Sequence, residues 1–326
     1  MKVLSLFDGM SCGQQAIRKS GINLTAYYAS EIKQHAIDLT NLNFPETIQV
    51  GSVLDLDGKS LPGIDLLIGG SPCQSFSFAG KMQGMSTLDN FEITSLDEYL
   101  SFKEKGFKFS GQSYLFWEYV RVLNDVKPKY FLLENVLMEK KWQNIISQTL
   151  GVEPIMIDSA DFTAQTRKRN YWTNIPVSEW TKKDIFISDI LENQTDQENR
   201  LQNLYDSGVV DLVVESNQIK LKVKEATKKG FVLVSDGDGV DLSFPTSKTR
   251  RGRLMKLKCN CLLRTNEYYV FKDGLLRKFT QSELERLQGV ENGFTNSIQR
   301  NKAEDLLGDG WTIDVISHIF SYFKQQ

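Results

Sequence analysis

The chain has 326 residues, 40% of them hydrophobic, and its 41 acidic and 39 basic side chains leave a net charge of −2. This length suits one large domain with a smaller companion, and the charge taken alone argues against a nucleic-acid partner. Four cysteines and two histidines, spaced unlike a disulfide framework or a zinc site, argue against disulfides and a bound metal. Without an export signal or about 18 unbroken apolar residues, we expect a soluble cytoplasmic protein.

The first 175 residues alternate apolar, β-rich runs with segments of helical periodicity. We expect strands over 2–7, 25–30, 47–50, 64–69, 129–134 and 153–158, and helices over 31–42, 113–126 and 139–149. Because strands that alternate with helices form a parallel sheet, the pattern predicts an α/β fold with a doubly wound, Rossmann-like sheet.

The pattern changes after Pro176. Short alternating runs over 209–234 surround a lysine-rich turn, which predicts a separate, smaller and mostly β lobe. Thr280 and Glu283 form a predicted capping box for the helix that follows them. The segment 303–324 is apolar at helical spacing, and we expect it to return and pack on the first lobe.

Four predicted strands are followed by glycines or polar residues that suit a ligand site. These are FDGMSCG at 7–13, Glu31, GGSPCQ at 69–74 and ENV at 134–136. The carboxyl ends of parallel strands meet at one edge, where ligands bind. A glycine turn like FDGMSCG also serves nicotinamide and flavin enzymes, although it departs from G-x-G-x-x-G. Glu31 suits a ribose diol but could equally cap the next helix.

Cys73 differs from the other cysteines because it follows Gly-Gly-Ser-Pro on a loop entering the predicted crevice. Nearby amide dipoles there favour a thiolate, so we predict a nucleophile. Cys12, Cys259 and Cys261 are expected to be buried packing residues. Glu134 ends the apolar run YFLLE, so the fold places its carboxyl group in a partly dry site.

Seven basic residues and no acidic one lie between Phe244 and Arg264. Such a run can grip phosphates, but it is often only a solvated surface. Charge alone leaves both interpretations open.

Seven stretches, taken in this order, resemble the DNA cytosine-5 methyltransferases: FDGMSCG, GGSPCQSFS, LLENV, QTRKR, SKTRRGR, RKFTQSELERLQG and GDGWTIDVISHI. They span nearly the whole chain, and SPCQ, ENV and Q-x-R-x-R together are highly specific. FDG and GDGW look like the eukaryotic de novo branch, and SKTRRGR looks like phage and bacterial members. The resemblance implies a DNA (cytosine-5-)-methyltransferase of the restriction-modification kind. Its Rossmann-like catalytic domain would cover 1–177 plus 300–326, and its target-recognition domain 178–299.

The resemblance assigns chemistry to four residues. Cys73 would add to carbon 6 of a cytosine flipped out of double-stranded DNA, which lets carbon 5 attack a sulfonium methyl. Glu134 would contact ring nitrogen 3 and the exocyclic amine. Arg169 would hold the ring carbonyl, and Arg167 would brace Glu134. We expect the glycine- and serine-containing segment 75–113 to close as a lid.

The resemblance also implies S-adenosylmethionine as cofactor, with its ribose on Glu31 and its adenine at the 52–53 turn. The residues expected to contact it are Phe7, Asp8, Gly9, Met10, Ser11, Cys12, Glu31, Ile32, Ser52, Val53, Pro72, Leu115, Gly310 and Trp311. Ser52 stands where the family usually has an aspartate for the adenine amine, so either Asp55 substitutes or the cofactor binds more weakly. Asp309 replaces an asparagine that bacterial members favour.

The second lobe would read double-stranded DNA, with its basic run on phosphates and side chains around 205–270 on base edges. The residues expected at the DNA are Gln74, Ser75, Gln165, Lys248, Arg250, Arg251 and Arg253. A cognate restriction endonuclease, acting independently in a bacterial or phage-infected cell, is a further possible partner. We expect no metal and no membrane.

Three other interpretations compete with DNA methylation. Methylation of cytosine in transfer RNA belongs to a branch with the same core, but the substantial second lobe favours DNA. Ser52 and Asp309 would suit a catalytically weak DNA-binding relative, whereas intact Cys73 and Glu134 speak against it. A nicotinamide oxidoreductase lacks support without G-x-G-x-x-G.

Overall fold

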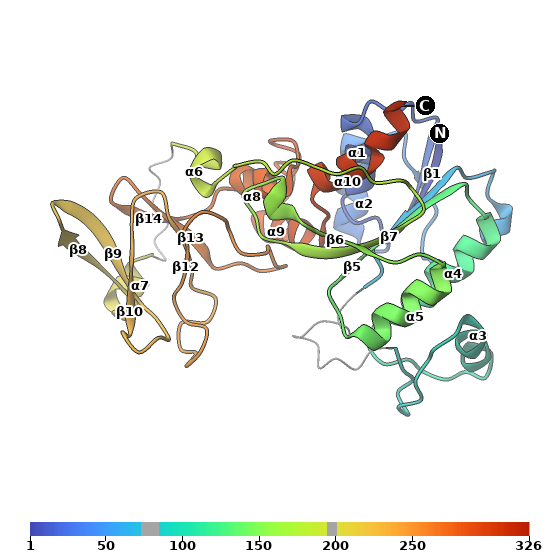
Figure 1. Cartoon of the computed structure of the whole chain (residues 1–326), viewed down its shortest axis with the longest axis horizontal. Helices are drawn as coiled ribbons and strands as arrows, with labels where there is room; N and C mark the ends of the chain where they lie inside the picture. The colour runs from blue at the N-terminus through green and yellow to red at the C-terminus, as the bar shows by residue number, and fades with distance from the viewer. Residues whose placement is uncertain (73–84, 194–200, 326) are drawn as a thin grey trace. The chain divides into compact units, whose positions relative to one another are not determined.

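The chain is described from a computed structural model, which covers residues 1–72, 85–193 and 201–325. It forms two compact units (Figure 1): unit 1 is Met1–Asp158, Lys168–Trp180 and Val315–Gln326, and unit 2 is Ser159–Arg167 and Thr181–Asp314. Within the described ranges, no helix is long and apolar enough to cross a membrane.

A seven-stranded sheet with the order β3-β2-β1-β4-β5-β7-β6 forms the centre of unit 1. Its strands are β1 (Lys2–Leu6), β2 (Ala26–Ser30), β3 (Ile48–Gln49), β4 (Leu66–Gly69), β5 (Tyr130–Val136), β6 (Ile155–Asp158) and β7 (Lys168–Thr173). The six predicted strands and the parallel arrangement of the first five are confirmed. The sequence prediction missed β7, which lies antiparallel between β5 and β6.

Helices cover both faces of this sheet (Figure 1). The helices of unit 1 are α1 (Cys12–Lys19), α2 (Gln34–Asn43), α3 (Leu96–Glu104), α4 (Leu115–Val126), α5 (Lys140–Leu150) and α10 (Ile313–Phe320), with the short turns η1 (Gly58–Ser60) and η3 (Ser321–Gln325). Of these, α3 packs against α4. Because side chains alternate along a strand, Leu4 and Leu6 face one way and pack with Trp117 of α4 and Trp142 of α5. This double cover confirms the doubly wound prediction.

The predicted return of the chain to unit 1 is confirmed for α10. Ser20 Oγ donates to the carbonyl of Ser317, and Ser317 Oγ donates to the carbonyl of Ala16, both on or beside α1. The preceding helix, α9 (Arg300–Asp309), belongs to unit 2 instead.

Several side chains of residues 85–113 are part of the core of unit 1. Met85, Ile93 and Tyr99 have no exposed surface and join the cluster around α4. The prediction of a closing lid is therefore wrong for this segment, because burying three large side chains fixes it in place. The remainder of the predicted lid, 75–84, lies outside the described residues.

Unit 2 contains the predicted smaller β lobe, with a three-stranded antiparallel sheet β10-β9-β8 and a four-stranded one, β12-β11-β13-β14, together with helices. Its elements are β8 (Val210–Glu215), β9 (Gln218–Lys224), β10 (Phe231–Val234), β11 (Gly239–Asp241), β12 (Arg253–Met255), β13 (Tyr268–Lys272), β14 (Leu275–Lys278), η2 (Ser159–Asp161), α6 (Ile187–Ile190), α7 (Leu201–Asp206), α8 (Gln281–Gln288) and α9. The predicted capping box starts α8: Thr280 Oγ1 accepts from Glu283 N at 3.1 Å, and Glu283 Oε2 accepts from Thr280 N at 2.8 Å.

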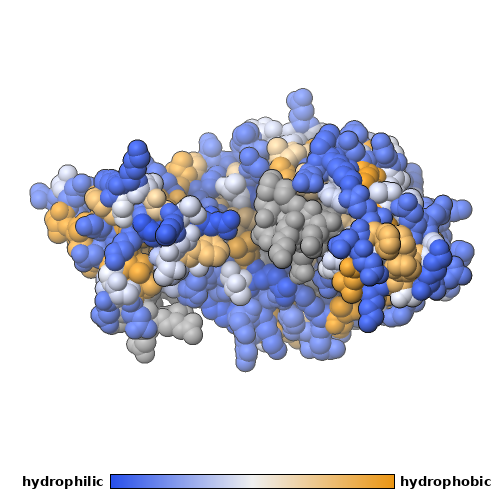
Figure 2. All heavy atoms as spheres, turned by 90° about the horizontal axis from the view of Figure 1, so that it is seen from below, coloured by the Kyte–Doolittle hydropathy of each residue, from blue (hydrophilic) through white to orange (hydrophobic). Residues whose placement is uncertain are grey.

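Hydrophilic side chains predominate on the face shown in Figure 2. Where described residues are visible there, hydrophobic side chains form small separate patches.

Candidate active site

The predicted ligand edge exists in unit 1. In the parallel register, Leu6 lies opposite Ser30 and Gly69, and Gly69 lies opposite Leu133. The loops after β1, β2, β4 and β5 therefore start at the same edge of the sheet.

The loop after β1 is held by a buried carboxylate. Asp8 Oδ1 accepts from Tyr27 Oη at 2.7 Å, and Asp8 Oδ2 accepts from Ser11 Oγ. Burial raises the pKa of Asp8 to about 6. Phe7 and Ser11 both adopt left-handed backbone conformations, with φ of 58° and 56°, which L side chains rarely do. This network therefore maintains an unfavourable loop shape.

Only part of this loop reaches the surface. Phe7 and Gly9 are half-buried, whereas Met10, Ser11 and Cys12 are buried, the first two completely. The structure does not bring Met10 and Ser11 to the surface, contrary to the expected cofactor contacts, because α1 begins here and turns both residues into the core.

Glu31 ties the first two loops together. Its Oε2 accepts from Gly9 N at 2.7 Å, and its Oε1 accepts from Ile32 N at 2.8 Å and Lys33 N at 2.9 Å. The carboxylate thus caps amides before α2 and also stays half-exposed at the edge. Beside it, Ile32 is 72% exposed. An oxygen acceptor next to an open apolar side chain suits a ribose that carries a flat base.

The turn that follows β3 lies next to Glu31 in unit 1. Ser30 Oγ donates to Gly51 O at 2.8 Å, and Val50 N donates to Ala29 O at 2.9 Å. Ser52 Oγ accepts from Leu54 N at 3.2 Å, so this hydroxyl closes the turn. Val53 is buried, and Asp55 is exposed.

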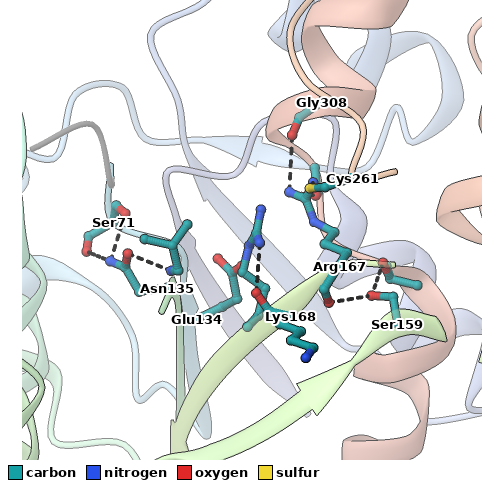
Figure 3. A network of polar contacts seen from close by, with 12 residues as sticks. Ser71, Glu134, Asn135, Ser159, Arg167, Lys168, Cys261 and Gly308 are labelled. Carbon is teal, nitrogen blue, oxygen red and sulfur yellow. Dashed lines mark hydrogen bonds and ion pairs between the residues drawn. The ribbon is translucent and has the colours of Figure 1, made fainter. Parts of the chain in front are cut away.

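At the end of β5, Glu134 and Arg169 form an ion pair. The Arg169 Nε to Glu134 Oε1 distance is 2.9 Å, and both side chains are mostly buried. The next residue, Asn135, donates through Nδ2 to Ser71 O at 3.1 Å and Ser71 Oγ at 3.0 Å, as Figure 3 shows. This amide joins the end of β5 to the Ser71–Pro72 segment after β4.

Arg167 has a different place from the one predicted. Its Nη1 donates to Cys261 Sγ and Leu262 O, and its Nη2 donates to Gly308 O and Gly310 O, all within unit 2. Figure 3 shows the bond to Gly308. The prediction that Arg167 braces Glu134 is wrong, since Arg169 forms that ion pair. Register is the reason: Arg169 lies opposite Val136, which places it diagonally across from Glu134 on the same face.

Gln165 is fully buried in unit 2. Its Nε2 donates to Leu287 O at 3.0 Å and Gln288 Oε1 at 3.1 Å, and its Oε1 accepts from Leu262 N at 2.7 Å. The prediction that Gln165 contacts DNA is therefore wrong in this structure, because its amide is engaged inside the unit.

The basic run divides into exposed and internally bonded side chains. Lys248 and Arg250 are exposed, and the Arg250 guanidinium lies 5.7 Å from the Phe244 ring centre. Arg251 donates to two backbone carbonyls, Glu225 O and Ser247 O. Arg253 pairs with the buried carboxylate of Asp241. Lys248 and Arg250 are thus the better-exposed cations of the predicted DNA set.

The other predicted residues lie as follows. Cys73, Gln74 and Ser75 are outside the described residues, Pro72 and Leu115 are half-buried in unit 1, and Gly310 and Trp311 belong to unit 2. Asp309, the predicted departure, lies 3.6 Å from Arg264 Nε through its carboxylate. In the part of the chain that the structure describes, no three His, Cys, Asp or Glu side chains cluster as a metal site.

The sequence analysis placed Asn135 at the ligand edge, within ENV, but gave it no role, and it missed Tyr27. The role of Asn135 comes from its two hydrogen bonds to Ser71, which the sequence does not reveal. Tyr27 carries no such signal, because only the packing of β2 beside β1 brings its hydroxyl to Asp8.

The model of the C-5 cytosine-specific DNA methylase family matches residues 1–96 and 100–325. An orphan methyltransferase of Bacillus phage SPR is 36% identical over 138 residues, which cover 42% of this chain and 26% of that protein. A type II methyltransferase of Neisseria lactamica is 34% identical over 140 residues, with 42% and 28% covered. The chain thus aligns with about a quarter of the length of these two relatives. A type II methyltransferase of Neisseria gonorrhoeae is 23% identical over 100% of this chain and 96% of its own length.

Solved structures share the fold. A Dnmt2 methyltransferase of S. pombe superposes with a TM-score of 0.64 at 17% identity, covering 100% of this chain and 98% of its own. A prophage-encoded putative DNA modification methyltransferase of E. coli gives 0.62 at 17% identity, with 100% and 99% covered.

Proposed function

The chain belongs to the C-5 cytosine-specific DNA methylases, and on that premise we propose that it transfers a methyl group from S-adenosylmethionine to carbon 5 of cytosine in double-stranded DNA. The observation that carries this proposal is the set of polar contacts at the end of β5. There, a buried Glu134–Arg169 ion pair lies one residue from the Asn135 amide, which holds the segment directly before Cys73.

The residues at the end of β1, β2 and β3 fit the proposed cofactor. Gly9 has a φ of +57°, and nothing lies within 4 Å of where a side chain would start, so the loop leaves room for a ligand. Glu31 offers carboxylate oxygens for a ribose diol, and Ile32 offers an apolar surface for adenine. S-adenosylmethionine, when bound, supplies an electrophilic methyl group on a sulfonium.

The reaction begins with Cys73, whose thiolate forms a bond to carbon 6 of the extruded cytosine. The electron pair of the 5,6 double bond then becomes available at carbon 5, which bonds the methyl group as the bond from methyl to the sulfonium sulfur breaks and its electron pair stays on that sulfur as a neutral thioether. Loss of the carbon-5 hydrogen as a proton restores the double bond and releases the Cys73 sulfur. The bond between Cys73 and carbon 6 is therefore formed and broken within one turnover.

Glu134 contacts ring nitrogen 3 and the exocyclic amine as negative charge develops there. Arg169 orients this carboxyl group, because its Nε lies 2.9 Å from Oε1. The contact of Arg169 with the ring carbonyl is part of the same proposal. Asn135 fixes the Ser71–Pro72 segment and thereby the start of the Cys73 loop.

Unit 2 is proposed to read the DNA, with Lys248 and Arg250 on phosphates. A cognate restriction endonuclease, where one accompanies this chain, would act as a separate protein.

The decisive experiment uses duplex DNA that contains 5-fluorocytosine, whose carbon 5 cannot lose a proton. We expect a covalent protein–DNA complex that survives denaturing electrophoresis and requires S-adenosylmethionine, and Cys73→Ala should give none. In parallel, tritiated cofactor should label cytosine carbon 5 in ordinary DNA. Label on adenine, on a cytosine amine or only on transfer RNA would contradict the proposal.

A further inference from the structure

Arg121 of α4 connects this helix to the turn after β3. Its Nε donates to Glu118 Oε2 at 2.6 Å, its Nη1 to Leu56 O at 2.9 Å, and its Nη2 to Val53 O at 2.8 Å. The side chain is only 19% exposed, so these bonds form largely out of water. One planar guanidinium therefore fixes two carbonyls of a single turn.

Glu118, which holds Arg121, has no exposed surface. A buried carboxylate is stable only when donors surround it. Glu118 Oε1 accepts from Tyr99 Oη at 2.5 Å and Lys103 Nζ at 2.6 Å, and both donors come from α3. Burial raises the pKa of Tyr99, so its hydroxyl keeps its proton and donates. Helix α3 thus fixes Glu118, and Glu118 fixes Arg121.

Helix α4 also packs closely against Gly58, at the end of the turn. A side chain at Gly58 would start 2.6 Å from Cβ of Asp125, on the same helix as Arg121. Inside the turn, two bonds are made, both to Ser52: Asp55 N to its carbonyl and Leu54 N to its hydroxyl. Helix α4 therefore contributes as many hydrogen bonds to residues 53–57 as the turn makes within itself.

The same turn is bonded to the end of β2. Ser30, which precedes Glu31, donates to Gly51 O at 2.8 Å. A shift of the turn would consequently change its distance from Glu31, the proposed ribose ligand.

We propose that Arg121 is a positioning residue for S-adenosylmethionine, and that Tyr99, Lys103 and Glu118 hold it in place. This inference rests on the proposed function, since it takes the 52–57 turn as the adenine site. In this proposal Arg121 itself contacts the turn and not the cofactor. Its loss should therefore weaken binding of the cofactor without slowing the chemical step.

Arg121→Lys keeps the charge but cannot reach Glu118 and both carbonyls from one nitrogen with the same geometry. Tyr99→Phe keeps every charge and removes one hydrogen bond to Glu118. Lys141→Met is the matched control, because Lys141 forms an exposed ion pair with Glu92 elsewhere in unit 1. The measurements are calorimetric binding of S-adenosylhomocysteine, KM and kcat for methylation of DNA, and thermal unfolding.

We expect Arg121→Lys to weaken S-adenosylhomocysteine about tenfold and to raise KM for the cofactor in parallel, because it loses charged hydrogen bonds. Its kcat should stay within about twofold of the wild type. Tyr99→Phe should show the same direction at about threefold, and Lys141→Met no change. If Arg121→Lys does not fold, Tyr99→Phe decides.

Unchanged affinity in the folded variants, or a fall in kcat at constant KM, would overturn the positioning role. Failure of the proposed function looks different: the wild type itself would not bind S-adenosylhomocysteine, or it would bind and leave DNA cytosine unmodified. In that second case, the affinity measurements still test Arg121.

Discussion

Asp8 should make the stability of the protein fall as pH rises from about 4 to above 6. Its pKa is 3.8 in its ordinary setting and about 6 in the folded chain, because burial disfavours the charged form. Between these values the unfolded chain loses a proton that the folded chain retains. A raised carboxyl pKa therefore contributes stability that is complete below the ordinary value and is lost as pH rises through the folded value.

The magnitude follows from the shift of about two pKa units, each worth about 1.4 kcal/mol, which gives about 3 kcal/mol. Asp8→Asn removes the titration and keeps one oxygen acceptor for Tyr27 or Ser11. The lost acceptor changes the free energy of unfolding by a constant amount at all pH values. Only the slope of the difference between the two proteins therefore reports the burial of Asp8.

The assay is urea unfolding of wild type, Asp8→Asn and the exposed control Asp89→Asn at several pH values from 4 to 7.5. We expect the free energy of wild type minus that of Asp8→Asn to drop by about 3 kcal/mol across this range and to level off above pH 7. The control should run parallel to the wild type. Parallel curves for wild type and Asp8→Asn would refute the burial of a carboxyl group at this loop.

Gly308→Ala should lower the free energy of unfolding by about 3 kcal/mol or more, because its new methyl would lie 2.2 Å from the backbone carbon of Leu263. Gly13→Ala should cost less, about 1 kcal/mol, because its new methyl meets the movable end of the Ile68 side chain. Urea unfolding measures both variants, and a larger loss of stability for Gly13→Ala than for Gly308→Ala would contradict this packing. Lys258→Met should destabilise by about 3 kcal/mol because Lys258 donates to three carbonyls, those of Ala160, Thr163 and Ile185, whereas the exposed Lys256→Met should be neutral. Joint replacement of Lys248 and Arg250 by Gln should reduce by about 2 the slope of the logarithm of the DNA-binding constant against the logarithm of salt concentration. An unchanged slope would mean that these two side chains do not contact DNA phosphates.

Much of the fold could be predicted, because strands and helices follow from the pattern of apolar and polar residues within short stretches of sequence. Runs such as LLIG and YFLL are apolar on both sides, as strands between two helix layers must be. The Thr280–Glu283 box is equally local, since both partners lie within one turn of helix. The ligand edge then follows from strand direction alone.

What the sequence determined by itself is therefore the first six strands of unit 1 and the helices between them at 31–42, 113–126 and 139–149, the family, and the edge at which Glu31 and Glu134 lie. Only the tertiary structure decided that Arg169 rather than Arg167 pairs with Glu134, that Gln165 is buried, and that residues 85–113 join the core. The physical reason is that these partners are distant in sequence: a ladder between β5 and β7 and the contact of α3 with α4 select them, and a one-residue change of register would select others.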